Sequence, residues 1–446
     1  MNLPILFQAI LKNPVKIKLA LFLILFVLFF ISIQGITGCA PSKRFTSDDE
    51  RSKEKIDNSS SGIELNNYTK LDEVAISEIR VLLNEYKSTH QFLIESTLDL
   101  FINDSKIAVI NKGNKIIINA ISNNLQFNVL NKIFNSNQFI LLPNDVNGII
   151  KIDNKKYRGK IIINSFNGNV RIINQISLED YVKGVMTKEM PLGRDLEHYE
   201  ALKAFAICAR TYAYIKIFES KSYYDILPDT RDQVYGGADA ETEYSNRVVD
   251  ETRNLILLYK SNPAIIFYHS TCGGTTEDAE NVFTKVNVPY LRSVKDGLLP
   301  YCIISPRYEW TEIIPEYKVV DRLLRAGLIS GKNFKVKDII VNSRFESGRI
   351  NELEFILTGN GKEQKVKLYG NNIRSVIRTA DDNSILRSNF FDIRFSNNRT
   401  IIINGRGNGH GVGMCQWGAI GMSRNGINHK EILNHYYPGT TLQELK

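Results

Sequence analysis

The stretch from Leu178 to Ile215, LEDYVKGVMTKEMPLGRDLEHYEALKAFAICARTYAYI, constrains the fold most, because its pattern predicts two helices separated by a break. Ser177 followed by Asp180 is typical of a capping box, and apolar residues then recur at helical spacing until Pro191 ends the run. The second helix is predicted to carry a broad, alanine-rich apolar face that packs in the core. Glu189 therefore stands at a rigid junction, where a catalytic group can be held in place.

Glu189 is the first candidate for chemistry. The carbonyl ends of a helix disfavour an anion, and Met190 and Pro191 next to it are expected to remove water from the carboxyl group. Both effects raise the pKa of a carboxyl group, which lets it stay protonated and donate its proton to a leaving group. The alternative is an ordinary surface glutamate.

The charge balance bears on partners. The chain has 446 residues, 43% of them hydrophobic, and 56 basic against 48 acidic residues leave a net charge of +8. A mildly basic surface suits polyanionic partners such as cell-wall polymers or anionic lipid, or is simply solvated. Because no arginine-rich block with interleaved aromatics occurs, we expect no nucleic-acid binding.

The N-terminal segment predicts export. Lys12, Lys16 and Lys18 precede an apolar run over residues 19–33, and residues 36–39, ITGC, follow it in a pattern similar to a bacterial lipobox. We expect residues 1–38 to be a lipoprotein signal peptide, Cys39 to be lipidated, and the charged, serine-rich residues 39–74 to be a flexible tether. The alternative is an uncleaved signal anchor. Either way, the expected location is outside the cytosol, as a membrane-anchored lipoprotein of the cell envelope.

The rest of the chain predicts an α+β fold, with mostly antiparallel β regions around a central helical core in a single assembly. Residues 75–176 form a β-rich lead of short apolar runs between asparagine- and glycine-containing turns, and residues 177–300 contain the helices and polar clusters. Residues 301–400 are predicted to form a second α+β lobe, and residues 401–446 a glycine-rich C-terminal motif.

Two polar clusters follow apolar strands. The first, YHSTCGGTTE from Tyr268 to Glu277, is delivered into a two-glycine turn, which is a common way to present side chains at a cleft. The second runs from Gly405 to Gly413, where alternating glycines allow close backbone approach around His410. It lacks the Gly-Lys-Ser/Thr ending of a phosphate-binding loop.

The cysteines leave three readings open. In an exported protein Cys272 and Cys302 are candidates for a disulfide, which is the simplest account. Alternatively, His269, Cys272, Cys302 and His410 supply the ligand types that zinc prefers, although the gap of thirty residues fits no compact finger. The third reading is free thiols. We expect no obligatory cofactor.

Taken together, the motifs resemble those of the SpoIID/LytB family, which comprises the stage II sporulation protein D and amidase-enhancer proteins. The resemblance begins near residue 75 and rests on these blocks in order: LEDYVKGVMTKEMP, EALKAFAICARTYA, DTRDQVYGG, FYHSTCGGTTEDAENVF, PYLRSV, SGRI, GRGNGHGVGMCQWGA and ILNHYYPGT. It implies a peptidoglycan lytic transglycosylase that cleaves the MurNAc–GlcNAc bond in glycan strands and leaves a 1,6-anhydro ring on MurNAc.

The resemblance also implies functional residues. The catalytic glutamate of the family's E-M-P motif maps onto Glu189, which would act first as an acid and then as a base, unlike the two carboxylates of a hydrolase. The implied substrate-binding residues are Arg210, Tyr268, His269, Ser270, Thr271, Gly273, Gly274, Arg406, His410, Gln416 and Trp417.

The chain departs from the family pattern at three positions. Asn408 replaces a usual aromatic residue, and Cys272 and Cys415 stand where serine is frequent. Two other functions compete with the lytic enzyme. One is a non-catalytic peptidoglycan-binding protein that enhances a partner amidase, and the other is a thiol-dependent peptidase or amidase using Cys272 or Cys415.

Overall fold

The computed structural model describes residues 78–129, 131–193, 196–220, 222–283, 286–331, 333–359 and 361–445. The predicted signal peptide, the lipidation site Cys39 and the predicted tether up to residue 74 lie outside the described residues. Among the helices in the described ranges, none is both long and apolar enough to cross a membrane.

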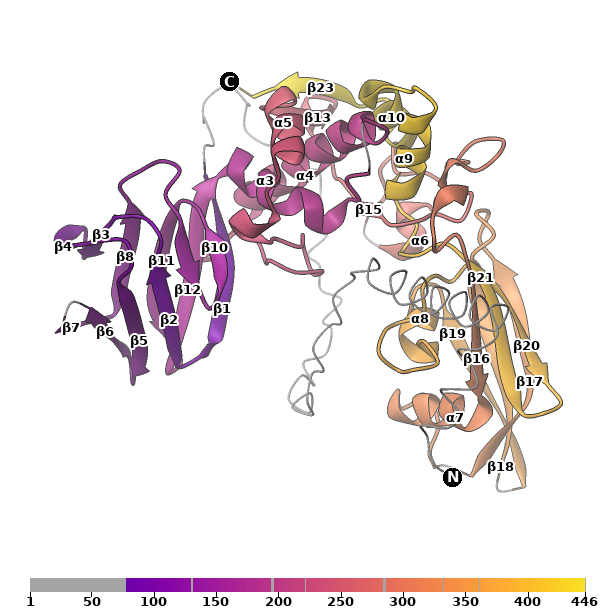
Figure 1. Ribbon diagram of the computed structural model, residues 1–446. Helices are drawn as coiled ribbons and strands as arrows, with labels where there is room; N and C mark the ends of the chain where they lie inside the picture. The colour runs from indigo at the N-terminus through magenta and orange to yellow at the C-terminus, as the bar shows by residue number, and fades with distance from the viewer. Residues whose placement is uncertain are drawn as a thin grey trace, which may run out of the picture. The chain divides into compact units, whose positions relative to one another are not determined.

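Helices and mostly antiparallel sheets confirm the predicted α+β class (Figure 1). The helices are α3 (Leu178–Glu189), α4 (Tyr199–Glu219), α5 (Glu243–Glu251), α6 (Ala279–Val282), α7 (Glu316–Arg325), α8 (Asn372–Ile377), α9 (Gln416–Arg424) and α10 (His429–Tyr436), with 3-10 turns η2 (Gly237–Ala240) and η3 (Tyr301–Ile304). The central helical core, the single assembly and the division at residues 176, 300 and 400 stay predictions.

The β-rich lead forms two six-stranded antiparallel sheets, ordered β1-β12-β11-β8-β3-β4 and β10-β9-β2-β5-β6-β7. Their strands are β1 (Glu78–Lys87), β2 (Thr89–Ile94), β3 (Leu98–Ile102), β4 (Ser105–Ile110), β5 (Lys115–Ile121), β6 (Asn124–Val129), β7 (Lys132–Ser136), β8 (Gln138–Pro143), β9 (Ile150–Ile152), β10 (Lys155–Tyr157), β11 (Lys160–Phe166) and β12 (Asn169–Ser177). In β5, Ile116 and Ile118 are buried while Ile117 is 43% exposed, so alternate residues face the core.

The many asparagines of this region have a local structural use. Asn103, Asn131 and Asn167 adopt positive φ in the turns between strands. Asparagine tolerates the left-handed region better than other residues with a side chain, because its short amide can hydrogen-bond the local backbone. These three asparagines are therefore suited to the tight turns that connect the short strands.

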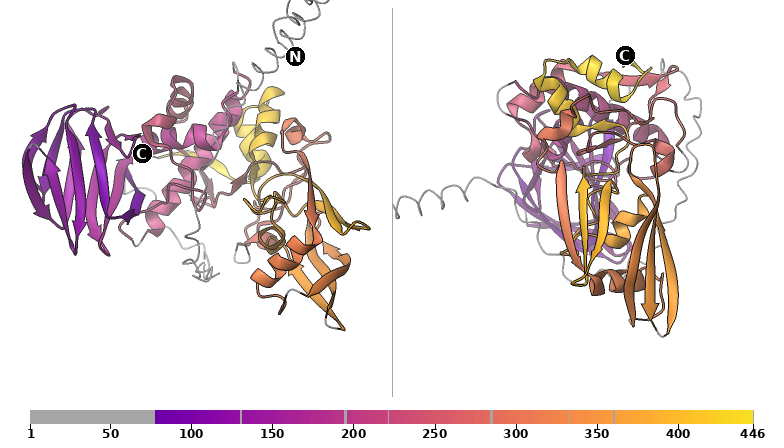
Figure 2. Two further views of the ribbon diagram at one scale, coloured as in Figure 1. Left: turned by 60° about the horizontal axis from the view of Figure 1, so that its bottom comes forward. Right: turned by 90° about the vertical axis from the view of Figure 1, so that its right-hand side faces the viewer.

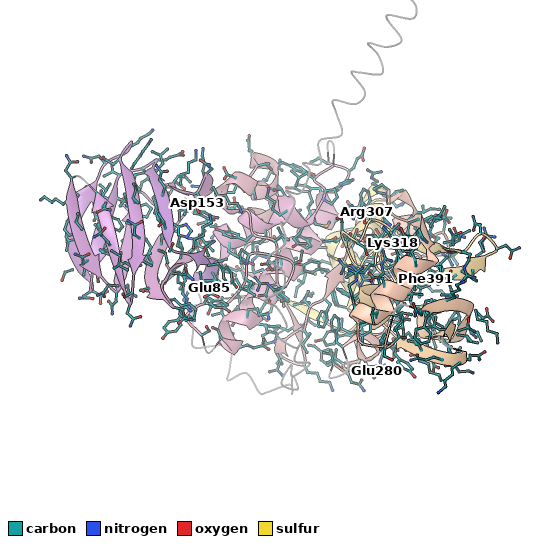
Figure 3. All side chains as sticks on the ribbon, turned by 90° about the horizontal axis from the view of Figure 1, so that it is seen from below. Glu85, Asp153, Glu280, Arg307, Lys318 and Phe391 are labelled. Atoms are coloured by element: carbon teal, nitrogen blue, oxygen red, sulfur yellow. The ribbon has the colours of Figure 1, made fainter. Side chains whose placement is uncertain are left out.

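Charged side chains within these sheets are paired locally. Arg171 donates to Glu85 at 3.1 Å, and Asp153 accepts from Lys87 at 2.9 Å and contacts the buried His90 at 2.8 Å. Figure 3 labels Glu85 and Asp153 on the β-rich part of the chain. These pairs engage the buried guanidinium of Arg171 and one nitrogen of the buried His90 imidazole, and they do not gather into a binding site.

The two helices predicted between Leu178 and Ile215 are present as α3 and α4. Ser177 accepts a hydrogen bond from the N–H of Asp180 at 3.1 Å, which starts α3 as the capping pattern predicts. Met190 is extended at φ −121°, ψ 136°, because the residue before a proline is kept out of the helical region. The alanine-rich α4 packs against α3, α5, α9, α10 and strand β13 (Leu255–Tyr259) (Figure 1).

A second hydrophobic core is built from residues between Trp310 and Ile403. This core is enclosed by two three-stranded antiparallel sheets, β16-β21-β20 and β17-β18-β19, and by the helices α7 and α8. The strands of these sheets run side by side in Figure 2. The strands are β16 (Glu309–Pro315), β17 (Phe334–Arg344), β18 (Ile350–Gly359), β19 (Lys362–Tyr369), β20 (Phe391–Ser396) and β21 (Thr400–Arg406). The first core is built from residues between Ile79 and Tyr437, and the chain returns to it at Val412.

The glycine-rich segment makes this return and joins two polar clusters that are distant in sequence. Strand β15 (Tyr268–His269) pairs in parallel with β22 (Met414–Cys415), so that Tyr268 lies opposite Met414. The remaining sheet is β14-β13-β23, from β13 (Leu255–Tyr259), β14 (Asn262–Pro263) and β23 (Thr441–Glu444). The β15–β22 pair is the framework on which the candidate site is built.

We expect Gly413→Ala to weaken this framework strongly. Gly413 has φ +69°, and an added Cβ would lie 2.1 Å from the carbonyl oxygen of Phe267. Backbone strain and the clash together are expected to lower the free energy of unfolding by about 2–4 kcal/mol. Urea unfolding followed by circular dichroism measures the loss.

The matched control is Gly426→Ala, because Gly426 has φ +77° but no atom within 4 Å of an added Cβ. It reports the strain of the left-handed conformation alone. If both variants lose the same stability, the close approach to Phe267 contributes nothing.

Candidate functional site

Glu189 ends helix α3, and its carboxyl group is held by a segment from elsewhere in the chain. The backbone N–H of Val234 donates to Oε1 of Glu189 at 2.7 Å. Glu189 is half-buried, as the sequence predicts for an acid beside Met190 and Pro191. The carboxyl group therefore has one oxygen fixed by the backbone.

Asp232 positions the segment that carries Val234. One carboxylate oxygen of Asp232 accepts from the hydroxyl of Tyr212 at 2.7 Å and contacts Nζ of Lys216 at 3.0 Å, both on α4. The other accepts from the N–H of Leu227 at 2.9 Å. The side chain thus ties its loop to α4 and folds the loop back on itself.

Glu189 opens into a pocket of about 360 Å³. The pocket is lined by the end of α3, by α4, by residues 230–232, by residues 266–268, by the residue after α6 and by the glycine-rich segment. Its lining residues are Glu189, Tyr212, Thr230, Arg231, Asp232, Ile266, Phe267, Tyr268, Phe283 and His410. Apolar and aromatic walls around a few polar groups are typical of a small-molecule or glycan site.

One wall of the pocket is made of aromatic rings that pack against one another. The rings of Phe267 and Phe283 stack with centroids 4.3 Å apart and an interplanar angle of 12°. His410 meets both rings edge-on. The wall is therefore packed as a unit.

The pKa of Glu189 is shifted upward, as the sequence predicts. Burial raises the pKa of the Glu189 carboxyl group, while the Val234 N–H and the side chain of Gln416 act in the opposite direction and limit the rise. Of the two causes that the sequence predicts, the helix end and the loss of water, the loss of water is the larger cause of the raised pKa. A carboxyl group in this state can be protonated at a higher pH than an exposed glutamate.

Tyr268 belongs to a buried hydrogen-bond chain. Gln233 donates from its amide to the Tyr268 hydroxyl at 3.2 Å, and the carbonyl of the same amide accepts from the Tyr181 hydroxyl at 3.0 Å. The Tyr268 ring also packs edge-on against Phe205 of α4. Tyr268 is thereby fixed in the pocket by residues of α3, α4 and the following loop.

His410 lines the pocket with its ring while both of its nitrogens are used. Nε2–H donates to the carbonyl of Tyr268 at 3.0 Å, and Nδ1 accepts from the N–H of Val412 at 3.1 Å. Burial lowers the pKa of His410 to about 3. His410 is therefore a neutral cross-link between the two strands and a pocket wall, with no free nitrogen for proton transfer.

Two predicted substrate-binding residues face the interior instead. His269 is 4% exposed and donates from Nδ1 to the carbonyl of Val412 at 3.0 Å, and Thr271 is 1% exposed with its hydroxyl 2.8 Å from that of Ser305. Alternation along the short strand explains the placement of His269, because Tyr268 lines the pocket and its neighbour points to the other side.

Arg210, another predicted substrate-binding residue, lies in the interior. It is fully buried on α4 and forms two hydrogen bonds of 2.8 Å each to the carboxylate of Glu179 on α3. A further N–H donates to the carbonyl of Leu255 at 3.0 Å. Arg210 therefore joins α3, α4 and β13 and does not line the pocket around Glu189.

The other predicted binding residues surround the pocket without lining it. The backbone N–H of Trp417 donates to the carbonyl of Ser270 at 3.0 Å, which joins α9 to the end of β15. Gly273 and Gly274 have positive φ, and an added Cβ on Gly273 would meet Arg406. The Arg406 guanidinium lies 4.6 Å from the ring centre of Phe390.

The predicted Cys272–Cys302 disulfide is not formed. The two Sγ atoms are 3.5 Å apart and both thiols are free, whereas a disulfide requires about 2.05 Å. Both sulfurs face a third cysteine, Cys415, and the carboxylate of Asp296. The histidines offered as zinc ligands are not part of this group.

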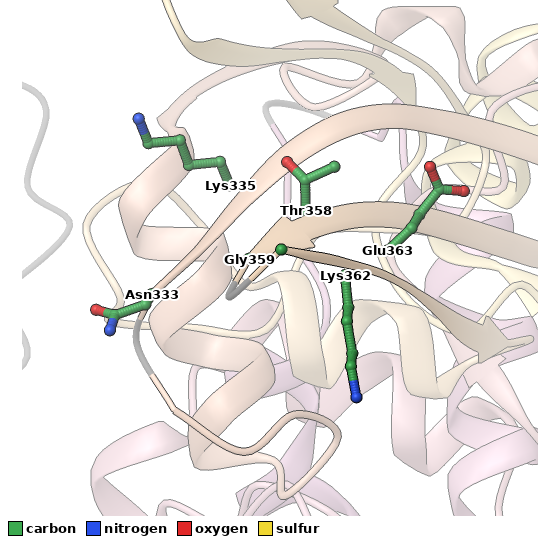
Figure 4. A pocket seen from close by; sticks show the side chains of 7 residues that line it. Asn333, Lys335, Thr358, Gly359, Lys362 and Glu363 are labelled. Carbon is green, nitrogen blue, oxygen red and sulfur yellow. The ribbon is translucent and has the colours of Figure 1, made fainter.

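A second depression lies far along the chain, at the turn between β18 and β19, with a volume of about 440 Å³. Its lining includes Lys335, Thr358, Lys362 and Glu363. Figure 4 shows Lys335 and Lys362 pointing away from each other. With no converging polar groups, it offers no chemistry comparable to that around Glu189.

The sequence reading missed most of the pocket lining. Tyr212, Arg231 and Asp232 come from α4 and the DTRDQVYGG block, and Phe267 and Phe283 flank the first polar cluster. In the sequence, the DTRDQVYGG block carries no signal for chemistry beyond the family resemblance. Its composition, a charged run closed by two glycines, was the available signal for a pinned loop.

The fold and site define an α+β protein with a pocket organised around one glutamate at a helix end. Residues 166–259 match the family model described as stage II sporulation protein, and residues 304–413 match a domain of unknown function (DUF8618). The chain is 31% identical over 299 residues to stage II sporulation protein D of Bacillus subtilis (strain 168), covering 61% of this chain and 76% of that protein. The chain belongs to the stage II sporulation protein D family.

Two further relatives match. An uncharacterized protein of Brachyspira hyodysenteriae is 34% identical over 290 residues, covering 64% of this chain and 72% of that protein. The amidase enhancer of Bacillus subtilis is 29% identical over 299 residues, which is 58% of this chain but only 40% of that longer protein. Both family branches named by the resemblance are therefore represented.

Proposed function

We propose that the protein is a peptidoglycan lytic transglycosylase that cleaves MurNAc–GlcNAc bonds in glycan strands and forms 1,6-anhydroMurNAc ends. The observation that carries the proposal is the Glu189 carboxyl group, half-buried in an aromatic pocket, with a raised pKa and one oxygen held by the Val234 N–H. Family membership supports the same assignment.

The second carboxylate in the pocket supports a one-acid mechanism. Asp232 already accepts from Tyr212, Lys216 and Leu227, so its oxygens are committed to holding its loop. A hydrolase of the usual kind needs a second carboxylate free to act as base or nucleophile. A transglycosylase needs none, because the sugar's own hydroxyl is the nucleophile.

In the proposed reaction Glu189 acts twice. The protonated carboxyl group donates its proton to the glycosidic oxygen, the bond from that oxygen to C1 of MurNAc breaks, and the GlcNAc-containing portion leaves as an alcohol. The Glu189 carboxylate then takes the proton of the MurNAc 6-hydroxyl as that oxygen bonds to C1. No water is consumed, and Glu189 returns to its protonated state.

Activity is expected to fall as pH rises through the raised pKa of Glu189, because the first step needs the protonated acid. Replacing Gln416 by Leu removes an interaction that stabilises the carboxylate, so the pKa of Glu189 rises further and the alkaline limb of the pH–rate profile moves to higher pH. Initial rates of anhydro-end formation across pH measure the shift. Gln364→Leu, on β19 outside the pocket, should leave the profile unchanged, and an alkaline limb moving downward in Gln416→Leu would contradict the assignment.

We also propose that the mature chain is exported and held at the cell-envelope membrane by lipidation at Cys39, which the lipobox-like sequence supports. A flexible tether from there would let the folded part reach glycan strands away from the membrane. Metabolic labelling with a fatty acid, lost in Cys39→Ala, tests the anchor.

The central experiment is product analysis. Purified full-length protein is incubated with peptidoglycan glycan strands, and the soluble products are examined by mass spectrometry. Anhydro-MurNAc ends are the expected result. Reducing MurNAc ends would instead show hydrolysis by water and would overturn the lytic mechanism.

A second candidate function is favoured by one relative. The amidase enhancer of Bacillus subtilis suggests that this chain binds peptidoglycan and stimulates a partner amidase without cleaving glycan itself. In that case the protein would accelerate peptide release by a purified cell-wall amidase while producing no anhydro ends.

A further inference from the structure

Three cysteines and one aspartate from four separate segments meet in one buried cluster. Cys272 follows β15, Asp296 lies in the loop before η3, Cys302 is in η3, and Cys415 is in β22. One ligand atom of each lies within 4.8 Å of every other, and all four residues are 0% exposed. None of these four residues lines the Glu189 pocket.

We propose that Cys272, Asp296, Cys302 and Cys415 bind one Zn²⁺ ion in a closed, tetrahedral structural site. Three thiolates and one carboxylate are ligand types that zinc takes, and four protein ligands complete its coordination. Because the ligands are fully buried, no position is open to water or substrate, which distinguishes a structural from a catalytic zinc site.

The distances fit coordination better than a disulfide. Zn–S bonds of about 2.3 Å in a tetrahedron hold two sulfurs roughly 3.8 Å apart. The Sγ atoms of Cys272 and Cys302 are 3.5 Å apart. A disulfide between them would engage two of the four groups and leave the convergence of Cys415 and Asp296 unexplained.

The surroundings of the ligands are already arranged as a zinc site requires. Backbone N–H groups donate to sulfur: that of Cys272 to Cys415 Sγ at 3.1 Å, that of Gly418 to the same sulfur at 3.2 Å, and that of Gly274 to Cys272 Sγ at 3.4 Å. Such donors offset negative charge on thiolates. Groups of this kind outside the ligand set orient ligands and tune their affinity for metal.

Asp296 is oriented as firmly as the sulfurs. Its Oδ1 accepts from the Tyr436 hydroxyl at 2.6 Å, and its Oδ2 accepts from the N–H of Cys302 at 2.7 Å. An added Cβ on Gly418 would lie 2.1 Å from the Tyr436 hydroxyl and 2.3 Å from Asp296 Oδ1. Position 418 therefore has room for glycine alone, because the carboxylate and its tyrosine need that space.

A buried cation stands beside the cluster. Arg349 is 1% exposed and donates from Nη2 to the carbonyl of Cys272 at 2.7 Å and from Nη1 to that of Thr275 at 2.8 Å. Three thiolates, one carboxylate and Zn²⁺ carry two net negative charges, which a neighbouring guanidinium partly balances. Arg349 immediately precedes β18, a strand of the second core, so this contact ties both cores to the cluster.

The proposed ion would fix the framework of the Glu189 pocket. Cys415 is in β22 and lies opposite His269, one residue beyond Tyr268. Coordination of Cys272 and Cys415 by one ion would lock the parallel pairing that orients Tyr268 and the glycine-rich segment. Binding energy of a structural metal acts as folding energy, so removing zinc should lower the melting temperature.

The test is the metal content of the full-length protein, purified without a polyhistidine tag and analysed by inductively coupled plasma mass spectrometry. One zinc per chain is expected in the wild type, and Cys302→Ser and Asp296→Asn should lose it. The matched control is Cys208→Ala, which removes a buried thiol on α4 outside the cluster and should keep one zinc. Absence of zinc from the wild type, or one equivalent of iron in its place, would overturn the assignment.

A second measurement needs no variant to fold. The wild type is denatured without reductant, alkylated and digested, and its cysteine peptides are identified by mass spectrometry. Zinc ligands are reduced, so Cys272, Cys302 and Cys415 should all be alkylated. A linked Cys272–Cys302 peptide would establish the disulfide and refute the site. Neither readout uses glycan, so the outcome is independent of the proposed lytic activity.

Discussion

Glu189→Gln is expected to abolish anhydro-end formation while leaving the fold intact. General acid–base catalysis by one positioned group contributes about 10²–10⁴-fold, and here the same group serves both steps, so a loss at or beyond the upper end is expected. Glutamine keeps an oxygen for the Val234 N–H, which preserves the local structure. Initial rates of anhydro-MurNAc release, with wild type and variant at equal concentration, measure the effect.

The stability of this variant gives a second, opposite readout. Burial raises the folded-state pKa of Glu189 above its unfolded value, so at a pH above that raised pKa the folded state is penalised for holding a partly desolvated carboxylate. The neutral glutamine has no such penalty. The variant should therefore melt at the same temperature as the wild type or higher at neutral pH, a combination typical of a residue kept for activity.

Glu219→Gln is the matched control for Glu189→Gln. Glu219 also ends a helix, α4, and burial raises its pKa as well, yet it does not line the pocket. It should retain full activity. If Glu189→Gln keeps more than about a tenth of the wild-type rate, Glu189 is not the general acid. If Glu189→Gln stimulates a partner amidase as strongly as the wild type does, the enhancer function is independent of Glu189.

Arg210→Ala is expected to be the most destabilising single substitution considered. It leaves the Glu179 carboxylate buried without its partner and also removes a donor from the Leu255 carbonyl. Breaking a buried ion pair on one side costs about 3–5 kcal/mol. Urea unfolding measures the loss as a fall in the midpoint at unchanged slope.

Two controls separate buried charge from lost packing. Arg247→Ala removes a surface pair with Glu251 on α5 and should leave the midpoint unchanged within error. The double substitution Glu179→Leu with Arg210→Met removes both charges and should be more stable than Arg210→Ala. A loss below about 1 kcal/mol in Arg210→Ala would show that the pair is not the link between α3 and α4.

Arg210 also shows what a motif leaves undecided. It lies in a block, EALKAFAICARTYA, that identifies the family, and an arginine in such a block resembles a ligand for an anionic substrate. Its environment on α4 is apolar on nearly every side, so only a partner from another helix can satisfy it. That partner is Glu179, and no local sequence pattern indicates that the side chain of Glu179 points into the core.

The cysteines show the same limit from another side. The sequence suggests a disulfide between Cys272 and Cys302, because it shows only how far apart residues are along the chain and not in space. The parallel pairing of β15 with β22 brings Cys415 to the same place, and the loop before η3 adds Asp296. The cluster of four potential ligands is therefore visible only once strands distant in sequence are paired.

What the sequence determined by itself is the local structure around Glu189. The Ser177 cap, the helical spacing and Pro191 are interactions among neighbours in the chain, so they place the acid at a helix end and predict the direction of its pKa shift. Tertiary structure decided the pocket, the partner of Arg210 and the cysteine cluster. Each depends on contacts between residues tens to hundreds of positions apart, whose geometry arises only when helices and sheets pack.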